Sequence, residues 1–223
     1  MLSVYFGHDE RARSGTTVFV QSVIAHAGEP LALIPITRAG FPGTPEGSNA
    51  FTLRRFLVPW SQQFRGWALF ADGADMLCRV DLNAILAERD EYKAVQVVKH
   101  DYQTKHPRKY VGAAMESDNP DYWRKNWASV MLINCGHYAW REVRPESVAR
   151  MDRMELLQLR FIPDPWIGDL DARWNWLADE YGENPDANIV HYTAGIPGFA
   201  HYRDAPMAAE CHAVLADATT STG

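Results

Sequence analysis

The chain has 223 residues, of which 47% are hydrophobic and 12% aromatic, and this composition supports a folded core and excludes a disordered chain. The formal net charge of −6 gives no overall attraction to nucleic acid or to an anionic membrane, and no run of eighteen apolar residues predicts a membrane span. The first residues lack the basic and apolar regions of a signal peptide, and three widely spaced cysteines without a CxxC pair predict free thiols and a cytoplasmic location.

The N-terminal third of the chain alternates strand and helix patterns. The apolar runs Leu2–Gly7 and Leu31–Ile36 predict buried strands, and residues 16–27 between them show helical spacing. Strand, helix and strand within about thirty-five residues form a crossover unit, which favours a parallel sheet. Residues 37–50 are rich in Gly and Pro and predict a loop, and residues 52–64 predict a helix broken near Pro59.

The next apolar run, Trp67–Ala71, predicts a strand that ends in two carboxylates, Asp72 and Asp75. Ligands of open α/β sheets bind outside the carboxyl ends of the strands. Two neighbouring carboxylates repel each other unless a cation lies between them, and oxygen ligands suit Mn²⁺ or Mg²⁺ bound together with substrate phosphates. A glycine turn with Asp72 as a helix N-cap explains the same residues equally well.

The rest of the chain continues the alternation without an internal linker. We expect helices at residues 81–91 and 145–157, strands at 94–98, 127–134 and 189–193, and a structured loop at 163–176. The predicted architecture is therefore a single α/β domain over residues 1–216, with a mostly parallel sheet flanked by helices. Residues 217–223 have no apolar pattern and predict a frayed tail.

Further residues are candidates for the same site. His191 follows the last apolar pair and, beside two carboxylates, would complete a three-ligand manganese set, although a lone histidine there is more often hydrogen-bonded structure. Arg55 would either bridge the carboxylates or pack as a helical arginine. Asp164, in a Pro-Asp-Pro turn, would either serve the turn or hydrogen-bond a sugar.

Residues 99–110 form a basic segment punctuated by aromatics. It contains Lys105 and Lys109, and Lys125 follows in a second basic pair. Most charge runs are solvated surfaces, but this one lies between two predicted strands near the acidic turn. A phosphate-facing role is therefore a reasonable alternative.

Six segments taken together resemble the glycosyltransferase family 8 group of GT-A enzymes, and more closely short glycosyltransferase-like proteins of bacteria and phages. They occur in order over residues 2–203: VYFGHDERA, RRFLVP, ALFADGADMLCRVDL, NWASVMLIN, WIGDLDARWN and IVHYTAGIPGF. The resemblance implies a Rossmann-like GT-A fold and transfer of a sugar from a nucleotide-sugar donor, a UDP-hexose above all. It also implies a divalent cation, Mn²⁺ or Mg²⁺, and retention at the anomeric carbon.

The resemblance also assigns residues. It places Asp72 and Asp75 at the metal-binding DxD motif, which is one residue longer here, and His191 at the metal-binding histidine of the C-terminal motif. HYTAGIPGF lacks that motif's lysine, which leaves Lys105, Lys109 or Lys125 to contact a diphosphate. The implied catalytic residues are Asp164, Arg55 and Lys109. The implied donor-binding residues are Tyr5, Phe6, Gly7, Asp9, Arg55, Asp72, Lys105, Lys109, Lys125 and Gly195.

The acceptor and two competing functions stay open on the sequence. A hydroxyl acceptor can be a surface saccharide or a hydroxymethylated base in phage DNA; the basic, aromatic residues 99–127 favour DNA, and the acidic net charge opposes it. A phage-encoded enzyme would act in the host cytoplasm. The alternatives to a hexosyltransferase are a sugar nucleotidyltransferase and a non-catalytic nucleotide-sugar-binding module.

Overall fold

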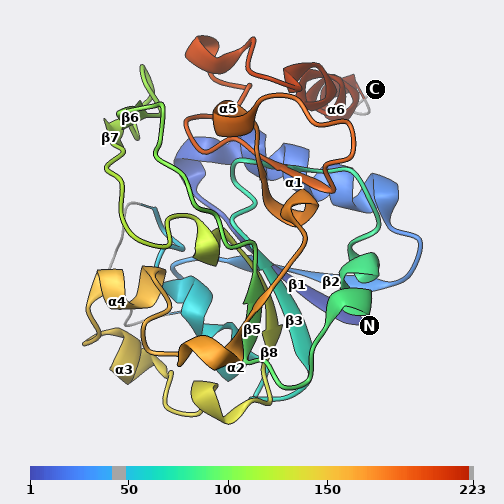
Figure 1. Ribbon diagram of the computed structural model, residues 1–223. Helices are drawn as coiled ribbons and strands as arrows, with labels where there is room; N and C mark the ends of the chain where they lie inside the picture. Colours follow the sequence, from blue (N-terminus) through green and yellow to red (C-terminus); the bar gives the residue numbers. More distant parts are fainter. Residues whose placement is uncertain (42–48, 221–223) are drawn as a thin grey trace.

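The structure is a computed structural model that describes residues 1–41 and 49–220. A six-stranded sheet with the order β2-β1-β3-β8-β5-β9 forms its centre (Figure 1). Strand β8 runs antiparallel to β3 and β5, and the other neighbours are parallel, as the predicted mostly parallel α/β sheet requires. The strands are β1 (Leu2–Gly7), β2 (Leu31–Ile36), β3 (Trp67–Ala71), β5 (Val95–Val97), β8 (Val130–Asn134) and β9 (Ile167–Asp169).

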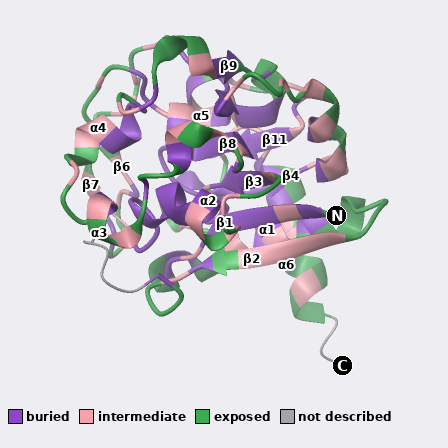
Figure 2. Ribbon diagram, turned by 90° about the horizontal axis from the view of Figure 1, so that it is seen from below, coloured by how far each residue is buried: buried purple, intermediate pink, exposed green. Residues whose placement is uncertain are grey.

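The central strands are buried on both faces, and successive residues enter two different hydrophobic clusters. In β3, Ala68 and Phe70 join one cluster and Leu69 and Ala71 join the other. Figure 2 shows this burial, with the edge strand β2 more exposed than its neighbours. Pro35 is tolerated in β2 because an edge strand need not donate a hydrogen bond at every residue.

Helices cover the two faces of the sheet. On one face, α1 (Arg13–His26) adds Phe19 and Val23 to the cluster of Leu69 and packs against α6 (Ala208–Thr220). The opposite face is covered by shorter helices whose apolar side chains join the cluster of Phe70 (Figure 1). These helices are η2 (Arg54–Leu57), α2 (Val58–Ser61), α3 (Pro145–Val148) and α4 (Arg153–Leu157).

A second, three-stranded sheet joins β10 (Trp176–Leu177), β11 (Ile189–His191) and β4 (Met76–Cys78), with β11 in the middle. A third hydrophobic cluster lies between this sheet and the C-terminal part of the chain. Each of the three clusters contains one free, buried cysteine: Cys135 with Phe70, Cys78 with Leu69, and Cys211 in the third.

The remaining elements are short. A two-stranded hairpin pairs β6 (Arg108–Lys109) with β7 (Ser117–Asp118). The short helices are η1 (Glu10–Ala12), η3 (Leu82–Glu88), η4 (Trp127–Ser129), η5 (Tyr138–Trp140), η6 (Asp164–Trp166), η7 (Ala172–Asn175), α5 (Ala178–Tyr181) and η8 (Ala200–Tyr202). Within the described residues, no helix is both long and apolar enough to span a membrane.

The structure corrects four details of the predicted elements. Residues 127–134 begin as η4 before β8, and the helix predicted for 145–157 is two helices because Asp152 caps α4. The helix predicted for 52–64 is broken near Pro59, as expected, into η2 and α2. The predicted loop 163–176 contains edge strand β9. The predicted last strand belongs to the second sheet.

Two further predictions concerned the C-terminal tail and the loop at residues 37–50. The tail predicted to fray from Asp217 continues α6 to Thr220, because that helix extends from a start anchored by buried Ala208 and Cys211. Half of the predicted loop 37–50, residues 42–48, lies outside the described residues.

Candidate metal and donor site

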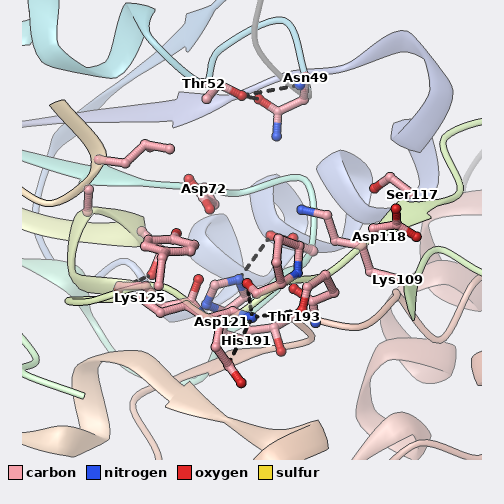
Figure 3. A pocket seen from close by; sticks show the side chains of 18 of the residues that line it. Asn49, Thr52, Asp72, Lys109, Ser117, Asp118, Asp121, Lys125, His191 and Thr193 are labelled. Atoms are coloured by element: carbon pink, nitrogen blue, oxygen red, sulfur yellow. Dashed lines mark hydrogen bonds and ion pairs between the residues drawn. The ribbon is translucent and has the colours of Figure 1, made fainter. Parts of the chain in front are cut away.

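A cavity of about 540 Å³ lies where the central and second sheets meet. Asp72 directly follows the last residue of β3, Asp75 directly precedes the first residue of β4, and His191 is the last residue of β11. Because β8 is antiparallel to β3, its start also reaches this edge, where the Asp72 N–H donates to the carbonyl of Ser129 over 2.9 Å. Figure 3 shows the cavity with Asp72, His191, Lys109 and Lys125 around it.

The acidic turn fits closely against the elements below it. Gly73 has φ of +67°, a conformation that favours glycine. A Cβ at Gly7 would lie 2.5 Å from the Asp72 carbonyl oxygen, and one at Gly15 would lie 1.8 Å from the Ala74 carbonyl oxygen. These glycines therefore allow the turn to pack on β1 and α1, which sets the position of both carboxylates.

Arg55 faces Asp72. Its Nη1 lies 2.6 Å from Asp72 Oδ1 and donates to the carbonyl of Ala128 over 2.7 Å. Its Nε donates to the carbonyl of Thr52, and its guanidinium lies 4.9 Å from the ring centre of Phe70. Burial raises the pKa of Asp72 to about 6, against the opposing charge of Arg55.

Asp75 is held from two sides. Tyr110 donates its hydroxyl to Asp75 Oδ2 over 2.9 Å, and His191 Nε2 lies 3.6 Å from Oδ1. Burial favours the protonated form of Asp75, but the charge of His191 and the hydrogen bond from Tyr110 outweigh it, so the pKa of Asp75 is lowered.

Asn175 fixes the tautomer of His191. The Asn175 amide nitrogen donates to Ser129 Oγ over 2.8 Å and to the carbonyl of Asn126 over 3.2 Å, so its oxygen faces His191. His191 Nδ1 lies 2.9 Å from that oxygen and must carry a proton to bond it. The lone pair of a neutral His191 is then on Nε2, the atom that faces Asp75, which is the arrangement of a metal-ligating histidine with an outer hydrogen bond.

The three predicted ligands are thus brought together. One ligand atom from each of Asp72, Asp75 and His191 lies within 4.8 Å of the others. Asp72 Oδ1 and Asp75 Oδ1 are both buried; Asp72 Oδ1 forms the ion pair with Arg55 at 2.6 Å, whereas Asp75 Oδ1 makes no hydrogen bond with the described residues and lies 3.6 Å from His191 Nε2. Burying two neighbouring carboxylates is costly, and a divalent cation between them would lower that cost. The donor set, two carboxylates and an imidazole, suits Mn²⁺ or Mg²⁺.

The three predicted phosphate-binding lysines differ in placement. Lys109 lines the cavity, and its amine makes no hydrogen bond or ion pair with the described part of the chain. Lys125 also lines it, but its amine donates to the carbonyl of Pro120 over 3.0 Å and is buried. Lys105 does not line it, because its amine donates to the Glu180 carbonyl over 2.6 Å. Of the three, Lys109 is the one available to a ligand in the cavity.

Asp164 and Gly195 are not at the cavity, contrary to the sequence prediction. The Asp164 side chain is 76% exposed and accepts a hydrogen bond from Arg124 over 2.6 Å. Gly195 is needed for packing, because a Cβ there would lie 2.2 Å from the Tyr202 ring.

The predicted donor-binding residues at the end of β1 and just after it do not line the cavity either. The side chains of Tyr5 and Phe6 pack in the two hydrophobic clusters of the central sheet, and Gly7 supports the acidic turn. Asp9 is paired with Arg11, and the Arg11 side-chain hydrogen bond lowers its pKa to about 2. None of these four side chains lines the cavity.

Two residues at the centre of the site were not predicted. Asn175 orients His191, which lies 16 residues later in the chain, through a side-chain hydrogen bond. Tyr110 orients Asp75, which lies 35 residues earlier, in the same way. Asn175 lies in the WIGDLDARWN segment that supports the resemblance, but neither residue follows a strand-end or charge pattern.

Comparisons with known proteins bear on both fold and family. No family model matches the chain. It is 30% identical over 218 residues to Protein CDI of Arabidopsis thaliana, covering 92% of this chain and 82% of that protein. Among solved structures, galactosyltransferase LgtC in complex with donor and acceptor sugar analogues has a TM-score of 0.57 at 16% identity, covering 97% and 96% of the two chains.

The glycosyltransferase GlyE of Streptococcus pneumoniae TIGR4 has a TM-score of 0.54 at 15% identity, covering 100% of this chain and 65% of its own. At these identities the likeness concerns the fold alone. The central sheet with its flanking helices is that of GT-A glycosyltransferases.

Proposed function

Since the chain belongs to the family of the Arabidopsis protein CDI and has a GT-A fold, we propose that it is a metal-dependent glycosyltransferase. It moves a hexose from a nucleotide sugar, a UDP-hexose above all, to a hydroxyl acceptor. The observation that carries the proposal is the cluster of Asp72, Asp75 and His191 at one cavity, where two carboxylates and an imidazole are held within 4.8 Å of one another in a buried setting.

The residues of the cavity fit the roles that such a transfer needs. A divalent ion held by Asp72, Asp75 and His191 Nε2 would act as a Lewis acid on the diphosphate leaving group. Arg55, Tyr110 and Asn175 position the three ligands through the contacts described above. Arg55 is thus a positioning residue rather than a catalytic one.

Lys109 would add positive charge where the leaving diphosphate develops negative charge. Lys109 pairs with Ser117 in the β6–β7 hairpin, and its side chain points into the cavity (Figure 3). A fixed cation at that place lowers the barrier to departure of the leaving group. Retention at the anomeric carbon is proposed from the resemblance to family 8 alone.

The proposal is tested by hydrolysis of nucleotide sugars without an acceptor. A thermal-shift panel of UDP-, GDP-, CMP- and TDP-sugars with and without Mn²⁺ first selects the donor, because ligand binding to the folded state raises the melting temperature. Release of nucleoside diphosphate is then measured for the wild type and for Asp75→Asn. The substitution keeps the shape and an oxygen for Tyr110 but removes the ligand charge.

We expect Mn²⁺-dependent hydrolysis that falls at least about a hundredfold in Asp75→Asn. Unchanged hydrolysis at saturating Mn²⁺ would exclude Asp75 from the metal site. Formation of a nucleotide sugar and pyrophosphate from a nucleoside triphosphate and a sugar 1-phosphate would instead identify a nucleotidyltransferase, and donor binding without any product would identify a non-catalytic module.

A further inference from the structure

A second cavity of about 410 Å³ adjoins the first. The segment 122–127, here termed the wall segment, separates them, and Tyr122 and Lys125 line both. The other lining residues of this second cavity are Lys99, His100, Asp101, Tyr102, Trp123, Arg124 and Trp127. A ligand there would therefore lie next to a donor bound in the first cavity.

Trp123 presents an exposed aromatic ring, already held in position, to the second cavity. Its side chain is 60% exposed, while the Arg124 guanidinium lies 4.0 Å from the centre of its ring. Arg124 is itself buried, and it donates to the carbonyl of Gln158 and to Asp164. The Arg124 guanidinium thus supports one face of the Trp123 ring. Because the ring is already held in place, less conformational entropy is lost when a ligand stacks on its other face.

The cationic side chains of this cavity are already paired. Lys99 lies 3.2 Å from Asp169, Arg124 lies 2.6 Å from Asp164, and Lys125 contacts Asp121 at 3.6 Å besides two backbone carbonyls. An anionic ligand would have to compete with these carboxylates. The cavity therefore suits a neutral ligand.

Polar groups in the cavity lining remain for hydrogen bonds to such a ligand. The Asp101 side chain is exposed, and His100 Nε2 is buried without a hydrogen-bond partner among the described residues. A neutral molecule with an apolar face and many hydroxyls matches an aromatic ring next to unpaired polar atoms. Saccharides have this chemistry, because the axial C–H groups of a pyranose form a flat apolar face.

The wall segment also carries backbone strain and a link to the metal ligands. Arg124 and Asn126 have φ of 59° and 62°, in the left-handed region that non-glycine residues rarely adopt. Such conformations are held by their surroundings and concentrate at functional sites. The carbonyl of Asn126 accepts from Asn175, whose oxygen faces His191, so the two cavities share one hydrogen-bond network.

We propose that the second cavity is the acceptor subsite, that its ligand is a neutral saccharide stacked on Trp123, and that a hydroxyl of this saccharide is presented past the wall segment to the donor. This inference rests on the proposed function. It selects a saccharide over a nucleic acid as the acceptor.

The test is direct binding of neutral oligosaccharides, lactose and maltotriose, measured by saturation-transfer NMR and titration on the full chain. We compare the wild type with Trp123→Ala and Trp123→Phe. Tyr92→Ala is the matched control, because Tyr92 is 85% exposed and does not line the second cavity. Far-UV circular dichroism and thermal melting check that each variant is folded.

We expect at least one of these saccharides to bind the wild type and the Tyr92 control equally, with an affinity at least about tenfold weaker in Trp123→Ala and intermediate in Trp123→Phe. Equal binding by Trp123→Ala, or no saccharide binding by the wild type, would overturn the inference. Binding of the oligonucleotide dT12 that depends on Trp123, without saccharide binding, would overturn it in favour of nucleic acid. Donor hydrolysis by the wild type reports on the proposed function separately, so the two can fail independently.

Discussion

The pKa of the Lys109 amine in the first cavity depends on two opposing effects. Burial lowers the pKa of its amine, and the nearby carboxylates of Asp75 and Asp72 act in the opposite direction. Burial has the larger effect, and the amine makes no ion pair with the described residues. A diphosphate entering the cavity would meet it without displacing a protein carboxylate.

Replacing Lys109 with Met should reduce donor turnover by about ten- to a hundredfold, because one charge-assisted contact contributes roughly 1.5–3 kcal/mol. The loss should appear in kcat more than in the donor KM if the contact strengthens as leaving-group charge develops. Steady-state release of nucleoside diphosphate measures both. Lys105→Met is the matched control, since the Lys105 amine is bonded to the Glu180 carbonyl outside the cavity. Equal losses in both variants would argue against a specific role for Lys109.

Residue-level prediction from the sequence succeeded where a residue ends a strand. Asp72 follows the apolar run of β3 and His191 ends that of β11, so the pattern placed both at strand ends, and the structure brings them together with Asp75 where the two sheets meet. Asn175 and Tyr110 could not be found this way, because their roles depend on hydrogen bonds between segments distant in sequence. Asp164 was misplaced because a Pro-Asp-Pro turn does not show which way its side chain points.

At the scale of elements, the acidic turn depends on α1 as much as on β3. Gly15 lies in α1, where Ala would favour the helix by roughly 0.5–1 kcal/mol. A Cβ there would nevertheless lie 1.8 Å from the carbonyl oxygen of Ala74, a backbone atom that cannot rotate away. The helix and the turn can therefore approach this closely only because residue 15 lacks a side chain.

Gly15→Ala should lower the free energy of unfolding by about 1–3 kcal/mol through overpacking. It should also weaken the stabilisation that Mn²⁺ gives, because the turn moves with both carboxylates. Gly40→Ala is the control, as its added Cβ would meet its nearest neighbour, Thr37 Oγ1, at an ordinary 3.6 Å. Urea unfolding with and without Mn²⁺ measures the two effects. Normal stability of Gly15→Ala would mean that the turn relaxes freely.

The elements themselves were predicted best where they are long or buried on both faces. The bounds of β1, β2 and β3 match the apolar runs in the sequence. Strand β9 was missed because its three residues, Ile-Gly-Asp, lie in a segment dominated by Trp, Pro and Gly. The antiparallel direction of β8 and the separate sheet of β11 depend on tertiary pairing, which periodicity does not encode.

For the whole molecule, Asp179 links stability to pH. Burial raises its pKa from 3.8 to about 6, although the hydrogen bond from the Ala194 N–H acts against this shift. The folded state then holds its proton more tightly than the unfolded state. The corresponding stability is present at low pH and is lost as the pH rises from about 4 through 6, by on the order of 2–3 kcal/mol.

Asp179→Asn should remove this dependence, because the amide stays neutral and its oxygen still accepts from Ala194. The variant should therefore gain stability relative to the wild type at pH 7.5 and lose that advantage at pH 4. Urea unfolding at several pH values measures the difference between the two proteins, in which titration of other groups largely cancels. Parallel pH profiles would show that Asp179 keeps an ordinary pKa.

The distribution of the three cysteines has a consequence for how the molecule opens. Burial raises the pKa of Cys78 and Cys135 to about 12 and that of Cys211 to about 11, so none reacts as a thiolate while its surroundings are closed. Because each hydrophobic cluster contains one of them, alkylation rates would report on three regions separately. Equal rates would mean that the molecule unfolds as one cooperative unit, and a faster Cys211 would mean that the C-terminal cluster detaches first.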